Sequence, residues 1–285
     1  MYGKEPNMSS QNVFLPSPAL RSFIWRYNFI QSESAVKKTQ IPPTLSSGLA
    51  FILEGTGHIH FQGKGIRLPD NYIIPVTDHP FLAESSEGNL VLGIQFFPGK
   101  FSEFFGWPQR LFFNTSVGLE ETEYGKSFCQ LKEQLYETKE LPEKILLIDH
   151  FLLRRMPEKP IFRPVMDFIL HEIYKSRGQL MHDELSRRTG MSGRSLRRLF
   201  LEHTGMNART FMRIFRFYHA FMLLNSRQFS SLTDLAYSAG YFDQAHFIHD
   251  FHAFTGASPN AFLKNHPGLA GQLGWEIPAK NTAKP

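Results

Sequence analysis

The chain has 285 residues, of which 42% are apolar and 20% are charged, and its formal net charge is +5. This composition is that of a globular protein and excludes collagen-like or wholly disordered chains, and the length suits two domains of about 100–150 residues each. The one cysteine, Cys129, cannot form an internal disulfide, so a reducing cytoplasm is the expected location. No apolar run approaches the roughly 20 residues of a membrane span, and the N-terminus lacks an apolar signal core, so neither membrane association nor export is expected.

The first 115 residues are predicted to form β-structure. Short runs rich in β-branched and aromatic residues, at 49–53, 58–61, 71–76 and 90–97, are separated by glycine-containing turns. This pattern is typical of a sandwich or a small barrel. Thirteen of the chain's 28 phenylalanines lie in the first 115 residues, so the sequence predicts either an apolar pocket or a core packed with rings.

Between Leu119 and Met156 the pattern becomes helical. Apolar residues recur at helical spacing before and after a break at Leu141-Pro142, which predicts two helices. These helices either pair two subunits into a homodimer or only cover the β-structure. We favour the homodimer. Pro157 and Pro160 then bracket a predicted linker.

The charge beyond this linker differs in sign from the charge before it. Residues 1–158 carry 15 Lys and Arg against 17 Asp and Glu, whereas residues 159–285 carry 16 against 9, a net charge of +7. Nine arginines and only one carboxylate, Glu202, lie from Arg187 to Arg227. Such a basic segment favours a polyanionic partner, because guanidinium groups suit phosphates and guanine edges. On charge alone, an ordinary solvated helical surface explains the segment equally well.

The region after the linker contains an internal repeat. Residues 183–191 align with 233–241 at an offset of 50, and residues 196–211 align with 247–262 at an offset of 51, so one residue is inserted between the two parts. Each unit has a short helix, a glycine turn and a second helix with an apolar stripe. This is the pattern of a helix-turn-helix, whose second helix can enter the major groove of DNA.

Two features of these units suggest how they would read DNA. In the second helix of the first unit, Arg194, Arg197 and Arg198 lie off the apolar stripe, and a helical bundle that uses the same core does not explain them. Between the units, residues 208–224 form an uninterrupted helical pattern of roughly 25 Å. Two DNA-contacting helices joined by such a rigid helix could enter successive major grooves, which recur about every 34 Å.

Residues 164–264 resemble the DNA-binding domain of the AraC/XylS family of bacterial transcription regulators. The motifs that carry the resemblance are Ser192-x-Arg-Ser-Leu-x-Arg-Leu-Phe200 with Gly205, then Leu235-Ala-x-x-Ala-Gly-Tyr241, Asp243-Gln-Ala-His-Phe247, Phe251, Gly256 and Pro259. The resemblance implies contacts to double-stranded DNA from Arg194, Ser195, Arg197, Arg198, Gln244, Ala245, His246 and His249. It also makes RNA polymerase a candidate partner.

The N-terminal part resembles, more loosely, the cupin-like sensory domains that precede this module in many members of the family. The segments are Pro18-x-Leu20-x-x-Phe-Ile24-x-x-Tyr27 and Phe96-Phe-Pro-Gly-Lys-Phe101. The resemblance implies control by an effector, which we expect to be a small apolar molecule at residues that the sequence does not identify.

The predicted fold is therefore a two-domain α+β chain: a small β-barrel or sandwich followed by helices, then an all-α domain with two helix-turn-helix motifs joined by a long helix. We assign residues 1–158 to the sensing and dimerisation domain, with its helices at about 119–156. Residues 159–266 form the DNA-binding domain, and residues 267–285 form a tail.

The second unit departs from the family pattern. It has histidines, His249 and His252, where the family usually carries basic residues, and residues 228–264 have a net charge of −2. Neutral imidazoles attract phosphate less than arginines do. We therefore predict that the first unit dominates the affinity for DNA.

No metal, cofactor or catalytic site is predicted. His246, His249 and His252 have helical spacing for a metal, but they lie on a predicted DNA-facing helix. The pair His58 and His60 lacks the glutamate that a cupin metal motif needs, since Lys64 and Gly65 stand in its place. Two alternatives stay open at this point: a cupin-type enzyme with a DNA-binding appendage, and a protein–protein adaptor. Cys129 is expected in the core rather than as a redox sensor.

Overall fold

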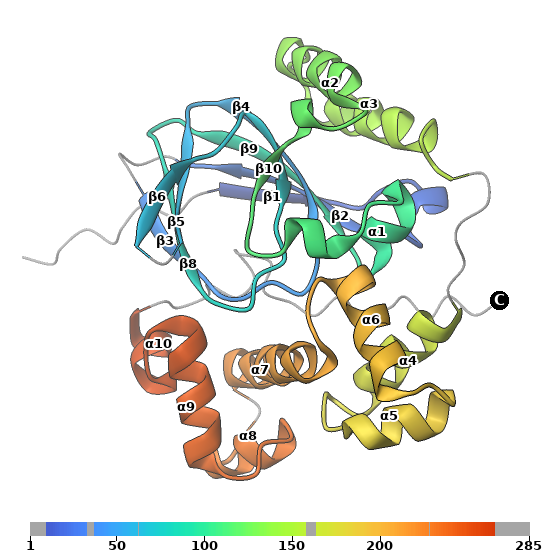
Figure 1. The fold of residues 1–285 in the computed structure, drawn as a ribbon. Coiled ribbons are helices and arrows are strands. Elements are labelled where there is room, and N and C mark those ends of the chain that lie inside the picture. Colours follow the sequence, from blue (N-terminus) through green and yellow to red (C-terminus); the bar gives the residue numbers. More distant parts are fainter. Residues whose placement is uncertain (1–9, 33–36, 62, 158–163, 228, 266–285) are drawn as a thin grey trace, which may run out of the picture. The chain divides into compact units, whose positions relative to one another are not determined.

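The structure is a computed structural model that describes residues 10–32, 37–61, 63–157, 164–227 and 229–265 (Figure 1). The chain divides into two compact units, Met1–Phe162 and Arg163–Pro285. The predicted linker around Pro160 and the predicted tail 267–285 lie outside the described residues. Within the described ranges, no helix combines the length and the apolar content that crossing a bilayer requires.

The N-terminal unit is a sandwich of two antiparallel sheets (Figure 1). The larger sheet has the order β1 (Ser10–Phe14), β2 (Ile24–Gln31), β9 (Leu90–Phe96), β4 (Gly48–Glu54), β7 (Asn71–Ile74) and β10 (Val117–Gly118). The smaller has the order β3 (Lys37–Ile41), β8 (Phe81–Ser85), β5 (Gly57–Phe61) and β6 (Lys64–Arg67). Of the two predicted architectures the sandwich is correct and the barrel is wrong, because the described strands form two separate sheets rather than a closed one.

The core of this unit follows from the alternation of side chains along its central strand, β4. Leu49, Phe51 and Leu53 point to one face of the larger sheet and join the main core, whereas Ile52 points to the other face and packs between the two sheets. The main core therefore lies on the face covered by helices. Most of its phenylalanine rings are at most 4% exposed and pack edge to face, so these rings fill the core.

Two helices cover this core, and the second of them begins at the predicted break, Leu141-Pro142. They are α2 (Gly125–Glu137) and α3 (Leu141–Leu153), which confirms the two-helix prediction, and a shorter helix, α1 (Lys100–Phe105), precedes them. Buried Lys144 of α3 donates from its ammonium to the carbonyls of Leu135 and Thr138 at the end of α2. The burial of this ammonium lowers the pKa of Lys144. The contact ties α3 to the C-terminus of α2.

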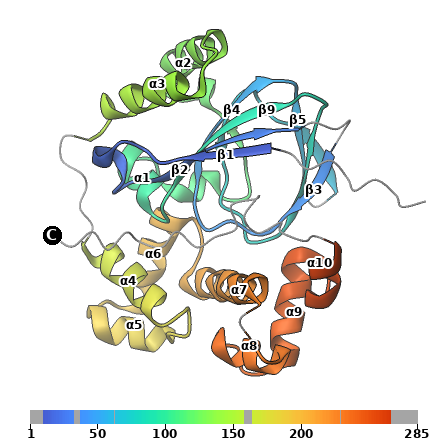
Figure 2. The same ribbon diagram turned by 180° about the vertical axis from the view of Figure 1, so that it is seen from behind.

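The C-terminal unit is all helical. Its helices are α4 (Pro164–Lys175), α5 (His182–Thr189), α6 (Gly193–Thr204), α7 (Ala208–Ser226), α8 (Leu232–Ser238), α9 (Gln244–Thr255) and α10 (Pro259–Asn265). The long helix α7 lies between the α5–α6 pair and the α8–α9 pair, as both views show (Figures 1 and 2). Phe251 of α9 contacts Phe217 and Phe221 of α7, with ring centroids 5.7 and 6.2 Å apart. These rings fix the second pair of helices against α7.

Candidate nucleic-acid interface

The two helix-turn-helix units are built alike at their turns. The glycine after the first helix has a positive φ in both units, +66° at Gly190 and +85° at Gly240, a conformation that side chains with a Cβ rarely adopt. The Cβ of any other residue at Gly240 would also meet the side chain of Gln179. The predicted one-residue insertion lies between this glycine and the N-cap of the second helix.

The second helices, α6 and α9, also begin and end in the same way. Each has 12 residues. Ser192 Oγ accepts a hydrogen bond from the amide of Ser195, at 3.2 Å, and Asp243 Oδ1 accepts one from the amide of His246, at 2.7 Å, so both predicted N-caps are confirmed. At the other end, the threonine hydroxyl of each unit donates to the carbonyl four residues earlier, at 2.8 Å. The repeat seen in the sequence is thus a repeat of local hydrogen bonding.

The candidate residues of α6 point outward. Arg194, Arg197 and Arg198 are exposed, while Leu196 and Phe200 of the same helix are fully buried. Among the residues that the structure describes, none of these three guanidinium groups has a hydrogen bond or an ion pair. They are therefore free to bind an anion or the edge of a base. Ser195 is half-buried and its hydroxyl lies 3.1 Å from that of Ser192, so it belongs to the cap.

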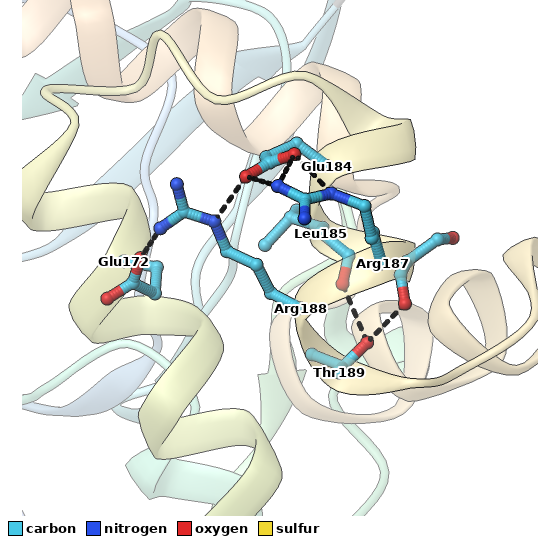
Figure 3. A network of polar contacts seen from close by, with 7 residues as sticks. Glu172, Glu184, Leu185, Arg187, Arg188 and Thr189 are labelled. Atoms are coloured by element: carbon cyan, nitrogen blue, oxygen red, sulfur yellow. Dashed lines mark hydrogen bonds and ion pairs between the residues drawn. The ribbon is translucent and has the colours of Figure 1, made fainter.

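The arginines of α5 are held differently. Figure 3 shows Glu184 between Arg187 and Arg188: both oxygens of its carboxylate lie 2.7 Å from a guanidinium nitrogen of Arg187, and one lies 2.6 Å from Arg188 Nε. Arg188 also contacts Glu172 of α4. Hydrogen bonds from Arg187, and then from Arg188, lower the pKa of Glu184. Carboxylates thus neutralise α5, and the free positive charge is concentrated on α6.

The candidate residues of α9 form a face with little positive charge. Ala245, His246 and His249 are exposed, and Gln244 is half-buried, with its side-chain oxygen accepting a hydrogen bond from Thr233 at 2.7 Å. His246 packs edge-on against Tyr241, with ring centroids 5.1 Å apart. Compared with α6, α9 therefore offers small and neutral groups.

A buried ion pair under α9 was not predicted from the sequence. The side chain of Asp250 is only 2% exposed and lies on the inner side of α9, where it accepts a hydrogen bond from Arg213 Nε of α7 at 2.9 Å. A second nitrogen of Arg213 lies 2.8 Å from the same oxygen. The rings of His246 and His249 lie 3.8 and 3.6 Å from this carboxylate. Asp250 therefore links the candidate DNA-facing helix to the central helix.

The repeat itself carries the signal that could have revealed this pair. At the offset of 51, Asp250 aligns with Leu199, which is buried in the first unit. A carboxylate at a position where the sister unit buries leucine needs a cationic partner. The apolar stripe alone could not identify Arg213, because the partner lies on another helix.

The histidines considered above as metal ligands do not lie in a metal-binding cluster among the described residues. His60 Nε2 lies 2.9 Å from Glu84 Oε2, a carboxylate on the neighbouring strand β8. Within the described ranges, no three His, Cys, Asp or Glu side chains converge in a way that could hold a metal ion.

Two protein families match the sequence. A helix-turn-helix domain matches residues 185–265, and a domain of unknown function (DUF6597) matches residues 12–118, which reach from within β1 to the end of β10. No curated relative matches the chain.

Among solved structures, ToxT from Vibrio cholerae is similar with 11% identity over 85% of this chain and 98% of that one, at a TM-score of 0.48. Unsaturated fatty acid-bound ToxT, from strain SCE256 of the same organism, has 11% identity over 93% and 99% of the two chains, at a TM-score of 0.46. The AraC-like transcriptional activator CuxR has 13% identity over 75% and 87%, at 0.27. At such low sequence identities and TM-scores, the structural similarity carries no information about ligands. The helix-turn-helix match contains both capped units around α7, whose sequence motifs resemble those of the AraC/XylS family.

Proposed function

We propose that the chain is a cytoplasmic transcription regulator that binds specific DNA sequences through α6 and α9. The observation that supports this function best is the set of three exposed guanidinium groups on the second helix of a helix-turn-helix, Arg194, Arg197 and Arg198. Arginine reads guanine through two hydrogen bonds in the major groove and also binds phosphate. RNA polymerase is the candidate protein partner, and no catalytic role is proposed.

The length of α7 supports reading of two successive grooves. The helix has 19 residues and is therefore about 28 Å long. Helices that enter successive major grooves on one side of a duplex are about 34 Å apart. Because α7 packs against both units through buried phenylalanines, the spacing between α6 and α9 is fixed.

Salt dependence tests this proposal against the adaptor alternative. If each of the three arginines neutralises one phosphate on random duplex DNA, the affinity falls by roughly 40-fold when the salt concentration rises from about 50 to about 200 mM. Fluorescence anisotropy with a labelled random duplex measures this change. An adaptor that does not use nucleic acid would give no binding at the lower concentration, and that result would overturn the proposal.

We also propose that the N-terminal unit forms a homodimer and responds to a small, largely apolar effector. An effector that binds one arrangement of the two DNA-binding units better than another would shift the population between them. The support for a dimer is a stripe on α3, where Leu146 and Leu153 have exposed fractions of 67% and 39%. The two leucines line an open hollow of about 650 Å³. Leucines exposed two turns apart on one helix are typical of a helix-pairing face.

Substitution of Leu146→Glu together with Leu153→Glu is expected to make the protein monomeric, because four carboxylates would have to be buried in the interface. Sedimentation velocity measures the change against the unmodified chain. Leu111→Glu is the matched control, since Leu111 is 56% exposed in the same unit but does not line the hollow beside Leu146 and Leu153. A dimer that persists in the double variant would contradict the assignment of this face.

A further inference from the structure

The turns of the two helix-turn-helix units differ by one residue, Phe242. In the first unit Met191 alone stands between the glycine and the N-cap, whereas in the second unit Tyr241 and Phe242 stand there. Since the repeat aligns Met191 with Tyr241, Phe242 is the inserted residue. Its exposed fraction is 84%, the highest of any large apolar side chain that the structure describes. The insertion therefore places a phenyl ring in solvent next to the start of α9.

The packing of this turn does not account for Phe242. A residue before the N-cap often packs against the fourth residue of the helix, which here is Phe247. Tyr241 makes that contact instead: it is 3% exposed, and its ring centroid lies 5.5 Å from that of Phe247. Because Tyr241 already fixes the turn against α9, the ring of Phe242 is available for a contact outside the fold.

The position of Phe242 indicates what that contact is. In helix-turn-helix proteins, residues at the N-terminal end of the second helix touch the edges of bases in the major groove. Phe242 directly precedes Asp243, the N-cap of α9, and Ala245 at the same end is exposed and adds a methyl group. The end of α9 that would face the base pairs is therefore partly apolar.

The charge at this end of α9 also favours base edges over the phosphate backbone. The carboxylate of Asp243 accepts a hydrogen bond from the amide of His246 at 2.7 Å and partly offsets the positive end of the helix. In the first unit the corresponding cap is the neutral Ser192, and Arg194 follows it two residues later. A carboxylate repels phosphate. Among the groups that base edges present in the major groove, the C5 methyl of thymine is the apolar one.

We propose that Phe242 recognises thymine. Its ring, together with the methyl group of Ala245, packs against C5 methyl groups of thymines in the half-site under α9. The two units then read different bases: guanine through the arginines of α6, and thymine through the apolar start of α9. This inference rests on the proposed function and adds to it the base that the second unit prefers.

The test uses the full chain and a duplex that this chain selects from a random library. Replacing every thymine of the duplex by uracil removes the methyl groups and leaves the hydrogen-bonding edges of the bases unchanged. Burial of one methyl group is worth roughly fourfold in affinity, so the unmodified chain should prefer the thymine duplex by about fourfold or more. Phe242→Ala should lower this preference to less than about twofold, because it removes most of the apolar contact. Fluorescence anisotropy measures all four affinities.

Two further variants serve as controls. Phe168→Ala removes a phenyl ring that is 40% exposed on α4 and should keep the full preference for thymine. Arg197→Ala should weaken binding to both duplexes by the same factor and so keep the preference as well.

The proposal is overturned if the unmodified chain binds the two duplexes alike, or if Phe242→Ala distinguishes them as well as the unmodified chain does. A chain that selects no duplex at all would overturn the proposed regulator and this contact together. Loss of the thymine preference alone would leave the regulator standing, so the two failures are distinct.

Discussion

Replacing Arg197 or Arg198 by alanine is expected to weaken binding to the cognate operator by about 1–3 kcal/mol each, or roughly 5- to 150-fold. The reason is geometric: both side chains leave α6 on its exposed side and have no partner among the described residues, so no internal hydrogen bond competes with the DNA. Because the substitutions remove no hydrogen bond or ion pair among the described residues, the fold should be unaffected. Anisotropy titrations with the operator and with a scrambled duplex measure the loss of affinity and of specificity separately.

The control for this prediction is Arg154→Ala, which removes an exposed arginine from the N-terminal unit and should leave DNA binding unchanged. The comparison variant is Gln244→Ala with His249→Ala on α9. Since α9 offers mostly neutral groups, this double variant should cost less affinity than either arginine substitution alone. If it costs more, the ranking of the two units is wrong.

Removing the guanidinium group of Arg213 is expected to lower the free energy of unfolding of the C-terminal unit by about 3 kcal/mol. The substitution Arg213→Met keeps an aliphatic stem but removes the guanidinium group, whose Cζ lies 4.7 Å from the centroid of the Phe254 ring, and leaves the carboxylate of Asp250 buried without its partner. The estimate lies at the lower end for buried pairs because 39% of the Arg213 side chain is exposed and the imidazoles of His246 and His249 are near.

A second substitution distinguishes the loss of this pair from a general loss of packing. Asp250→Leu gives the second unit the residue that the first unit buries at the aligned position, Leu199. The double variant Arg213→Met, Asp250→Leu should therefore recover most of the stability, because apolar residues can replace a buried ion pair at little cost.

Hydrogen exchange of the amides in α7 and α9 is the suitable measurement. Tryptophan fluorescence is less suitable, since Trp25 and Trp107 lie in the N-terminal unit and the third tryptophan, Trp275, lies outside the described residues. A single variant that exchanges like the unmodified chain would contradict the prediction, as would a double variant no more protected than Arg213→Met.

The sequence was informative wherever a local pattern determines the structure. The caps Ser192 and Asp243 and the start of a helix at Leu141-Pro142 each involve residues within a few positions of one another, and each was predicted. The repeat was found because its two units share such local patterns about 50 residues apart. The strands predicted at 49–53 and 90–97 are central and buried, so they read as apolar runs.

Some of the features that were missed depend on contacts between distant parts of the chain. β6 has the sequence Lys-Gly-Ile-Arg and is exposed along its whole length, so pairing with β5 specifies it rather than its own apolar residues. The assignment of individual residues to DNA contacts stays a prediction.

The matching ends of α6 and α9 have a practical consequence for engineering. Both helices have 12 residues, an N-cap that accepts from the amide three positions later, and a threonine that locks the last turn. The two helices therefore have equivalent ends. Outward-facing residues can be exchanged between α6 and α9 without changing the hydrogen bonds at those ends. The buried residues have to stay in their own unit: Leu199 in the first, and the pair of Asp250 and Arg213 in the second.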